Sequence, residues 1–249
     1  LLTRGLFPFP GQLTLESETV AHQSVLYQEI IHALQPKRGA KYVDCTLGAG
    51  GHAWGLLDGS GPDGCLLGLD LDPQALALAR QKLAPFGERA ILVQASYQTL
   101  QHQLEKLGWS AVDGILIDLG VSSMQLDTAE RGFSFLADAP LDMRFDPAGP
   151  TSAEDLVNEL PEAELADILF RYGEERRARQ VARAIVRARP LHTTGQLAQV
   201  VAGATTSGRG GERGPRIHPA TRTFQALRIA VNGELDALEA TLPQALQAL

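Results

Sequence analysis

The sequence predicts an α/β fold in which helices cover both faces of a parallel sheet. Four short apolar runs in the first half of the chain alternate with helical patterns, the rhythm of consecutive βαβ units. A glycine turn follows the first run and an aspartate ends the second, at the strand ends where open parallel sheets bind ligands. From about residue 127 to 221 no convincing strand is found. We therefore expect the sheet to carry an inserted all-helical domain.

The four apolar runs are the predicted strands. They cover residues 41–47, 65–71, 90–94 and 112–119. In a doubly wound sheet of order 3-2-1-4, the first and fourth strands are neighbours. The last run is apolar on both faces, which is typical of a strand with two neighbours, yet no later strand is available to pair with it.

A helix is predicted over residues 73–83, directly after the second strand. Asp72 is a natural N-cap, and Pro73 takes the first helical position, where proline is well tolerated. This assignment leaves Asp70, at the carboxyl end of the strand, free to face a ligand.

Two further helices are predicted in the second half of the chain. The first covers 174–189 and is ended by Pro190, and the second covers 219–249, with Pro243 as a candidate break. On the first, one face is apolar and the opposite face carries arginines. The apolar face holds Ala178, Val181, Ala182 and Ile185, and the arginines are Arg176, Arg179, Arg183 and Arg187. Residues 205–215 are glycine-rich and are expected to be a loop, either one that orders on a phosphate backbone or a linker.

The charge of the chain is divided unevenly. Residues 171–228 contain twelve arginines and three glutamates, which gives a local charge of +9. Because the overall charge is −7, the rest of the chain carries −16. Such asymmetry indicates an acidic cofactor domain joined to a basic surface for a polyanionic partner. The expected core covers 20–126 and 222–249, the helical insertion covers 127–221, and 1–19 form an N-terminal extension.

Composition excludes several classes of protein. The 249 residues are 44% apolar and 20% charged, and no apolar run approaches the ~20 residues of a membrane helix. Residues 1–20 match neither a signal peptide nor a transit peptide. Cys45 and Cys65 are expected as small core residues, which fits a reducing compartment, and we expect the cytoplasm. No metal site is expected, and the oligomeric state stays open, a homodimer included.

The glycine turn indicates an adenosyl cofactor. Gly48, Gly50 and Gly51 allow a sharp turn and a close approach to a ligand, and Asp70, 19 residues after Gly51, can accept both ribose hydroxyls. The turn alone leaves a dinucleotide and S-adenosylmethionine as alternatives.

A second group of candidate site residues lies in 113–125, where an apolar strand is followed by an acid, a glycine turn and two serine hydroxyls. Asp118 and Gln125 are expected to border the same crevice as the glycine turn. A hydride-transfer enzyme would show a downstream catalytic His, Tyr-x-x-x-Lys or metal set, and none has a recognisable spacing. The arrangement therefore favours group transfer.

The chain closely resembles the bacterial small-subunit ribosomal RNA N4-cytosine methyltransferases, the RsmH or MraW family, within the class I S-adenosylmethionine-dependent fold. The motifs that carry this resemblance are residues 22–26, 41–52, 69–73, 118–127, 130–135, 140–144, 172–175, 182–186 and 218–229. Together they are far more specific than a lone glycine motif. The resemblance implies methyl transfer from S-adenosylmethionine to the N4 amine of a cytidine in 16S rRNA near the decoding centre.

The resemblance also implies roles for individual residues. The cofactor side comprises Gly48, Gly50, Gly51 and His52 at the methionine end, Asp70 at the ribose, and Tyr97, Asp118 and Gln125 at the adenine side and the rest of the pocket. The family counterpart of Tyr97 is usually Phe, which suits stacking on adenine but no hydroxyl role. Asp118 is the candidate catalytic residue, because a carboxylate that accepts from N4 stabilises the developing charge and can take the proton.

The substrate side is predicted from the same motifs. Its candidates are Ser122, Ser123, Phe133, Phe135, Asp142, Arg144, Arg176, Arg179 and Arg183. The two phenylalanines are candidates to stack on the base, and the three later arginines are candidates to dock the RNA through phosphates. Asp142 and Arg144 either hold substrate or fix their loop as an ion pair.

Family members continue past a position like Leu249, and roughly the last fifth of their pattern is absent here. The chain also begins at Leu1 and stops without a capping signal, so we expect a fragment that lacks the C-terminal strands of the sheet. Three alternatives stay open: an amino-methyltransferase acting on DNA or a small molecule, a non-catalytic cofactor-binding RNA module, and a nicotinamide dehydrogenase.

Overall fold

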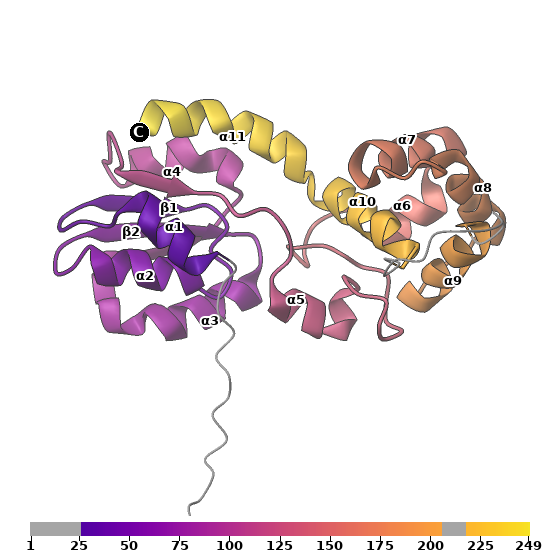
Figure 1. Ribbon diagram of the computed structural model, residues 1–249, viewed down its shortest axis with the longest axis horizontal. Coiled ribbons are helices and arrows are strands. Elements are labelled where there is room, and N and C mark those ends of the chain that lie inside the picture. The colour runs from indigo at the N-terminus through magenta and orange to yellow at the C-terminus, as the bar shows by residue number, and fades with distance from the viewer. Residues whose placement is uncertain (1–25, 206–217) are drawn as a thin grey trace, which may run out of the picture.

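The computed structural model describes residues 26–205 and 218–249. These residues form two lobes, one built around a sheet and one built of helices, which lie side by side along the long axis of the molecule (Figure 1). The predictions made for 1–19 and for most of the glycine-rich loop lie outside the described residues.

The sheet has the predicted strand order, β3-β2-β1-β4, and all neighbours are parallel. Its strands are β1 Lys41–Asp44, β2 Cys65–Asp70, β3 Ala90–Gln94 and β4 Gly114–Leu116. The strand β3 has the predicted bounds, and the other three are shorter than predicted. Within the described ranges β4 pairs with β1 alone, and the Val112 N–H just before it donates to the Ala248 carbonyl at 2.8 Å.

Helices cover both faces of the sheet. They are α1 Tyr27–Leu34, α2 Gly51–Gly59, α3 Pro73–Leu83, α4 Leu100–Lys106 and α11 Glu234–Ala248, with the short 3-10 helices η1 Ala84–Arg89 and η2 Tyr97–Thr99. Because successive strand residues point to opposite faces, Tyr42 packs with α2 and α3, whereas Val43 packs with α4 and α11. Cys45 is buried as expected, but Cys65 is only half-buried. The α/β prediction is confirmed.

The second lobe is helical, as predicted. It contains α5 Ser123–Asp127, η3 Ala129–Arg131, α6 Ala153–Glu159, α7 Glu162–Gly173, α8 Ala178–Ala188, α9 Thr194–Thr205 and α10 Ala220–Asn232. The part of this lobe that the structure describes has no strand, only an isolated bridge between Pro140 and Thr193. The predicted apolar face of α8 is buried in the core of this lobe.

Two helix boundaries differ from the predictions. Glu174 has a left-handed backbone (φ 50°) and ends α7 instead of starting the next helix, so Arg176 precedes α8. The C-terminal helical stretch breaks at Gly233 (φ 57°), where glycine tolerates the left-handed conformation. Pro243, the expected break point, lies inside α11.

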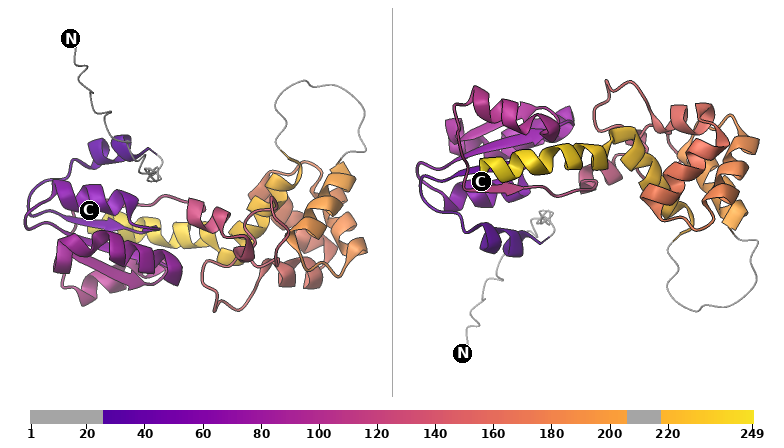
Figure 2. Two further views of the ribbon diagram at one scale, coloured as in Figure 1. Left: turned by 90° about the horizontal axis from the view of Figure 1, so that it is seen from below. Right: turned by 90° about the horizontal axis from the view of Figure 1, so that it is seen from above.

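The helix α10 belongs to the helical lobe and not to the sheet. Its Phe224 and Leu227 are part of the core of that lobe. Its contact with α7 is close, because a Cβ on Gly173 would lie 2.5 Å from the Arg222 carbonyl oxygen. The junction between the lobes therefore lies at Gly233 and not at the predicted residue 222. From there α11 runs back along the sheet (Figure 2).

Candidate cofactor and substrate site

The glycine turn between β1 and α2 has the conformation that its sequence predicts. Gly48 and Gly50 have left-handed backbones, with φ of 52° and 78°, which residues with a Cβ rarely adopt. A Cβ on Gly48 would meet no atom within 4 Å. The turn thus leads into the first turn of α2 and leaves space beside its backbone.

Asp70 is fastened to this turn, as its place at the end of β2 predicts. Its carboxylate accepts the Gly48 N–H and the Asp72 N–H, each at 2.8 Å. Burial raises the pKa of Asp70 by more than these backbone hydrogen bonds lower it. The side chain is half-buried and lies at the edge of the sheet where a ligand is expected.

Asp44 is a site residue that sequence reasoning missed. Its side chain is buried, Oδ1 accepts the Thr46 N–H at 3.2 Å, and Oδ2 has no hydrogen-bond partner. Burial raises the pKa of Asp44 to about 7, and the charges of Asp70 and Asp118 add to the rise. The available signal was an acid at the end of a strand, directly before a glycine turn.

Asp118 lies beside the same turn, because β1 and β4 are neighbours. Its N–H donates to Thr46 Oγ1 at 2.7 Å, and its side chain is exposed. Asp44, Asp70 and Asp118 therefore form a group of three carboxylates, which we call the acidic cluster. Such a cluster favours a positively charged ligand and disfavours a phosphate.

Tyr97 follows β3 in η2 and is half-buried against the core shared by α4 and α11. Its hydroxyl donates to the Glu234 carbonyl at 3.0 Å, at the start of α11. Burial raises the pKa of Tyr97 to about 12. The hydroxyl, for which the sequence suggested no role, thus ties η2 to the junction between the lobes.

His52 is buried in the first turn of α2, and its ring stacks on Tyr27 with 6.1 Å between centroids. This contact holds α1 against α2. A contact of His52 with the cofactor stays a prediction.

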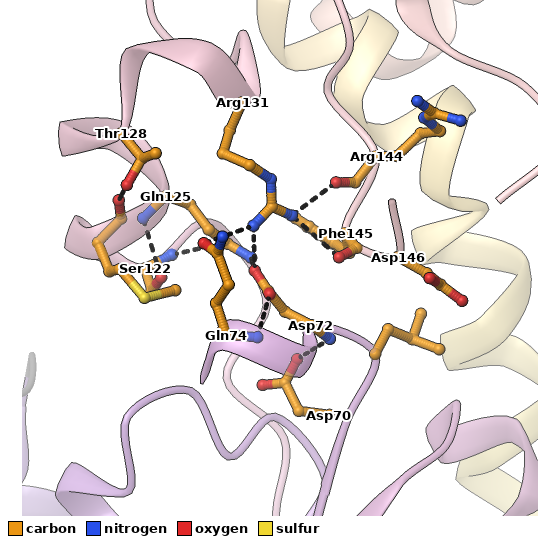
Figure 3. A network of polar contacts seen from close by, with 12 residues as sticks. Asp70, Asp72, Gln74, Ser122, Gln125, Thr128, Arg131, Arg144, Phe145 and Asp146 are labelled. Carbon is orange, nitrogen blue, oxygen red and sulfur yellow. Dashed lines mark hydrogen bonds and ion pairs between the residues drawn. The ribbon is translucent and has the colours of Figure 1, made fainter. Parts of the chain in front are cut away.

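Gln125 is buried in α5 and has a protein partner at each end of its amide. Nε2 donates to Asp72 Oδ2 at 3.0 Å, and Oε1 accepts the Ser122 N–H at 3.0 Å (Figure 3). Ser122 caps α5 in return, since its Oγ accepts the Gln125 N–H. Ser123 is the first residue of this helix and is half-buried. These contacts hold α5 against Asp72, and a cofactor contact of Gln125 stays a prediction.

Asp72 caps α3 as predicted, through the Gln74 N–H at 2.9 Å. It also forms a buried ion pair with Arg131, with 2.7 Å between Oδ2 and Nη1. Periodicity carries no signal for this pair, because the two residues are 59 positions apart and lie in different lobes.

The two candidate aromatic residues are packed against other rings. Phe133 is buried and stacks on Phe145 with 5.5 Å between centroids, and its stacking on a base stays a prediction. Phe135 is half-buried and packs edge to face on Phe224, with 4.9 Å between centroids. For this ring the stacking role stays a prediction.

Asp142 and Arg144 form an ion pair, with 2.6 Å between Oδ2 and Nη2. Arg144 Nη1 also donates to the Gly149 carbonyl at 2.8 Å. Of the two alternatives for this pair, the contacts support the one in which it fixes its loop.

The three candidate RNA-docking arginines lie in the helical lobe and are exposed. Arg179 and Arg183 are on α8, and Arg176 lies two residues before its start. Arg183 forms an exposed ion pair with Glu162 at 3.3 Å. Because α8 lies at the end of the molecule far from the sheet (Figure 1), these arginines do not converge on the acidic cluster.

The described ranges, 26–205 and 218–249, contain no group of three or more His, Cys, Asp or Glu side chains suited to hold a metal ion. They also contain no helix with the length and hydrophobicity needed to cross a bilayer.

Residues 19–249 match the model of the MraW methylase family. Ribosomal RNA small subunit methyltransferase H of Geotalea uraniireducens (strain Rf4) is 54% identical over 89% of this chain and 71% of that protein. The protein of the same name from Symbiobacterium thermophilum is 50% identical over 92% of this chain and 72% of that protein. A putative rRNA-methylase of known structure from Clostridium thermocellum is 24% identical, with a TM-score of 0.34 over 41% of this chain and 54% of that chain.

The family of this chain is shown by the sequence matches and not by the slight structural likeness. A methylase needs a methyl donor, in agreement with S-adenosylmethionine as the predicted cofactor. The parallel sheet, the glycine turn and the acid that ends β2 fit the same cofactor. The chain belongs to the MraW methylase family.

Proposed function

We propose that this chain transfers a methyl group from S-adenosylmethionine to the N4 amine of a cytidine in small-subunit ribosomal RNA, near the decoding centre and in the cytoplasm. Family membership and the names of the relatives support ribosomal RNA as the substrate. The observation in the structure that carries the proposal is the acidic cluster beside the glycine turn.

The acidic cluster fits S-adenosylmethionine better than a dinucleotide. S-adenosylmethionine carries positive charge on its ammonium group and on its sulfonium, whereas a dinucleotide would bring a pyrophosphate next to three carboxylates. The unpartnered Asp44 Oδ2 is a suitable acceptor for the ammonium group, since a buried carboxylate without a partner is costly. Asp70 would take the ribose and Tyr97 the adenine side.

Asp118 is the group that we assign to catalysis. The lone pair of the cytosine amine is delocalised into the ring, so the amine needs help to become a nucleophile. The cofactor, when bound, supplies a methyl group on a positively charged sulfur. The Asp118 carboxylate accepts a hydrogen bond from N4, stabilises the positive charge that develops there, and takes the proton that leaves. Its exposure leaves the carboxylate accessible to an entering base.

The exposed arginines at α8 would bind RNA phosphates away from the reacting base. Such contacts position a nucleic acid and do not read its sequence. Replacing Arg176, Arg179 and Arg183 together by glutamate should weaken RNA binding and lower its dependence on salt, without changing cofactor affinity. An unchanged RNA affinity with an unchanged salt slope would show that this surface does not dock the substrate.

The proposal is tested by following labelled methyl transfer from S-adenosylmethionine to small ribosomal subunits that lack the modification. The matched variant is Asp118→Asn, which keeps the size of the side chain and loses its negative charge. We expect the wild-type chain to label the RNA and the variant to be slower by about 100-fold or more when both are saturated with cofactor. A variant as active as the wild type would remove Asp118 from the mechanism, and a wild-type chain that binds cofactor without transfer would contradict the proposed reaction.

A further inference from the structure

A buried set of polar contacts joins the two lobes next to the candidate site, and we call it the Asp72 hub. The Asp72 side chain is fully buried, and its Oδ2 accepts from Arg131 Nη1 at 2.7 Å and from Gln125 Nε2 at 3.0 Å. Its Oδ1 caps α3. Figure 3 shows that one carboxylate thereby holds α3, α5 and the segment that follows α5.

Arg131 connects the hub to residues 144–145. While Nη1 pairs with Asp72, Nη2 donates to the carbonyls of Arg144 and Phe145, at 2.8 and 3.0 Å. Only a planar, forked guanidinium can meet an acid on one side and two carbonyls on the other. Arg131 thus fixes residues 144–145 relative to the end of β2.

Asp72 is two residues away from Asp70, the acid predicted to hold the ribose. The Asp72 N–H donates to Asp70 Oδ1, and Asp70 Oδ2 accepts the Gly48 N–H. A ligand that bonds to the Asp70 carboxylate must share it with these two backbone donors. Any shift of the Asp72 backbone then reaches the buried pair with Arg131, because a packed interior does not absorb such shifts freely.

The contacts continue from the hub to the second junction between the lobes. The Phe145 N–H donates to Asn232 Oδ1 at 2.7 Å, at the last residue of α10. Two residues later the Glu234 carbonyl accepts the Tyr97 hydroxyl at 3.0 Å. The helical lobe is therefore bonded to the sheet lobe at the hub, next to Asp70, and again at Glu234, next to Tyr97, where Arg228 of α10 pairs with the Glu234 carboxylate at 2.7 Å.

We propose that Arg131 is a positioning residue that couples occupancy of the cofactor site to the placement of residues 128–146 and of the helical lobe, so that S-adenosylmethionine and RNA bind cooperatively. The inference rests on the proposed function, because it takes the cofactor and the RNA as the two ligands. Coupling of this kind is reciprocal: each ligand tightens the binding of the other by the same factor.

The first test needs no variant. Amide hydrogen exchange is measured on the wild-type chain with and without S-adenosylhomocysteine. We expect slower exchange at the glycine turn and also, by about fivefold or more, at residues 143–145, where the Phe145 amide bonds to Asn232. Protection that is confined to the sheet lobe would overturn the inference.

The second test compares Arg131→Lys with Arg189→Lys. Lysine keeps the charge beside Asp72 but cannot also reach both carbonyls. Arg189 is a matched control, since it too donates to two carbonyls, those of Val157 and Leu160, but inside the helical lobe. The quantity measured is the Kd of S-adenosylhomocysteine with and without small-subunit RNA.

We expect RNA to tighten cofactor binding by about fivefold or more in the wild type and in Arg189→Lys, and by less than about twofold in Arg131→Lys. An unchanged ratio in Arg131→Lys, or a ratio of one in the wild type, would overturn the inference. If Arg131→Lys does not fold, the exchange measurement decides. A wild-type chain that binds no S-adenosylhomocysteine contradicts the proposed function itself, and the inference falls with it.

Discussion

Replacing Asp44 by asparagine should change how the stability of the folded chain depends on pH. Burial raises the pKa of Asp44 from 3.8 to about 7, so between these values the folded chain holds a proton that the unfolded chain has lost. The free energy of unfolding therefore falls as pH rises through this window and levels off above pH 7. A shift of about three units corresponds to a loss of about 4 kcal/mol as an upper figure, of which about 3 kcal/mol falls between pH 5 and pH 8.

The variant Asp44→Asn keeps the acceptor for the Thr46 N–H and has no charge to bury. Urea unfolding of both proteins at several pH values isolates Asp44, because all other titrating groups are shared. The variant should gain stability relative to the wild type as pH rises from 5 to 8, by about 3 kcal/mol. A stability difference that does not change with pH would refute the account of Asp44 as a buried carboxyl that is reluctant to ionise.

The cofactor should offset the loss of wild-type stability at pH 8, because its ammonium group gives the ionised Asp44 a partner. Saturating S-adenosylmethionine should raise the Tm of the wild type more than that of Asp44→Asn, as expected for a ligand that binds the variant more weakly. Equal shifts would show that Asp44 does not face the cofactor.

Three further substitutions and one control test the architecture. Gly132→Ala places a Cβ 2.4 Å from a backbone carbonyl at a φ of +72°, and urea unfolding should show a loss of about 2 kcal/mol or more. Gly173→Ala should lower the free energy of unfolding by about 1–3 kcal/mol in the same assay, since its Cβ would press on the Arg222 carbonyl. The control is Gly203→Ala on α9, where an added Cβ meets no atom within 4 Å, and this change should be neutral or stabilising. Tyr97→Phe removes one hydrogen bond to the start of α11 and should lower stability by about 1 kcal/mol without changing cofactor Kd more than about twofold; a much larger loss of affinity would give the hydroxyl a direct role at the cofactor.

The features that follow local rules could be predicted from the sequence. Alternating apolar runs located all four strands, and the rules for parallel sheets ordered them. The Asp72 cap and the buried face of α8 depend on residues a few positions apart, which periodicity and capping preferences capture. The glycine turn was also predictable, because Gly48 and Gly50 adopt backbone angles that other residues avoid.

The features that depend on distant partners could not be predicted in this way. The sequence assigned no role to Arg131 by itself, and only the fold brings it to Asp72. The end of α7 at Glu174 and the position of Pro243 inside α11 follow from tertiary packing that overrides local preference. The stacking of Phe145 on Phe133 likewise joins residues that no local pattern pairs.

The proposed reaction is methylation of the exocyclic amine of a cytidine. The most direct measurement is to digest the RNA labelled in the transfer assay and to identify the modified nucleoside by mass spectrometry. We expect N4-methylcytidine from the wild-type chain and almost none from Asp118→Asn. Label on a ring carbon, on a ribose hydroxyl or on another base would contradict the proposed reaction.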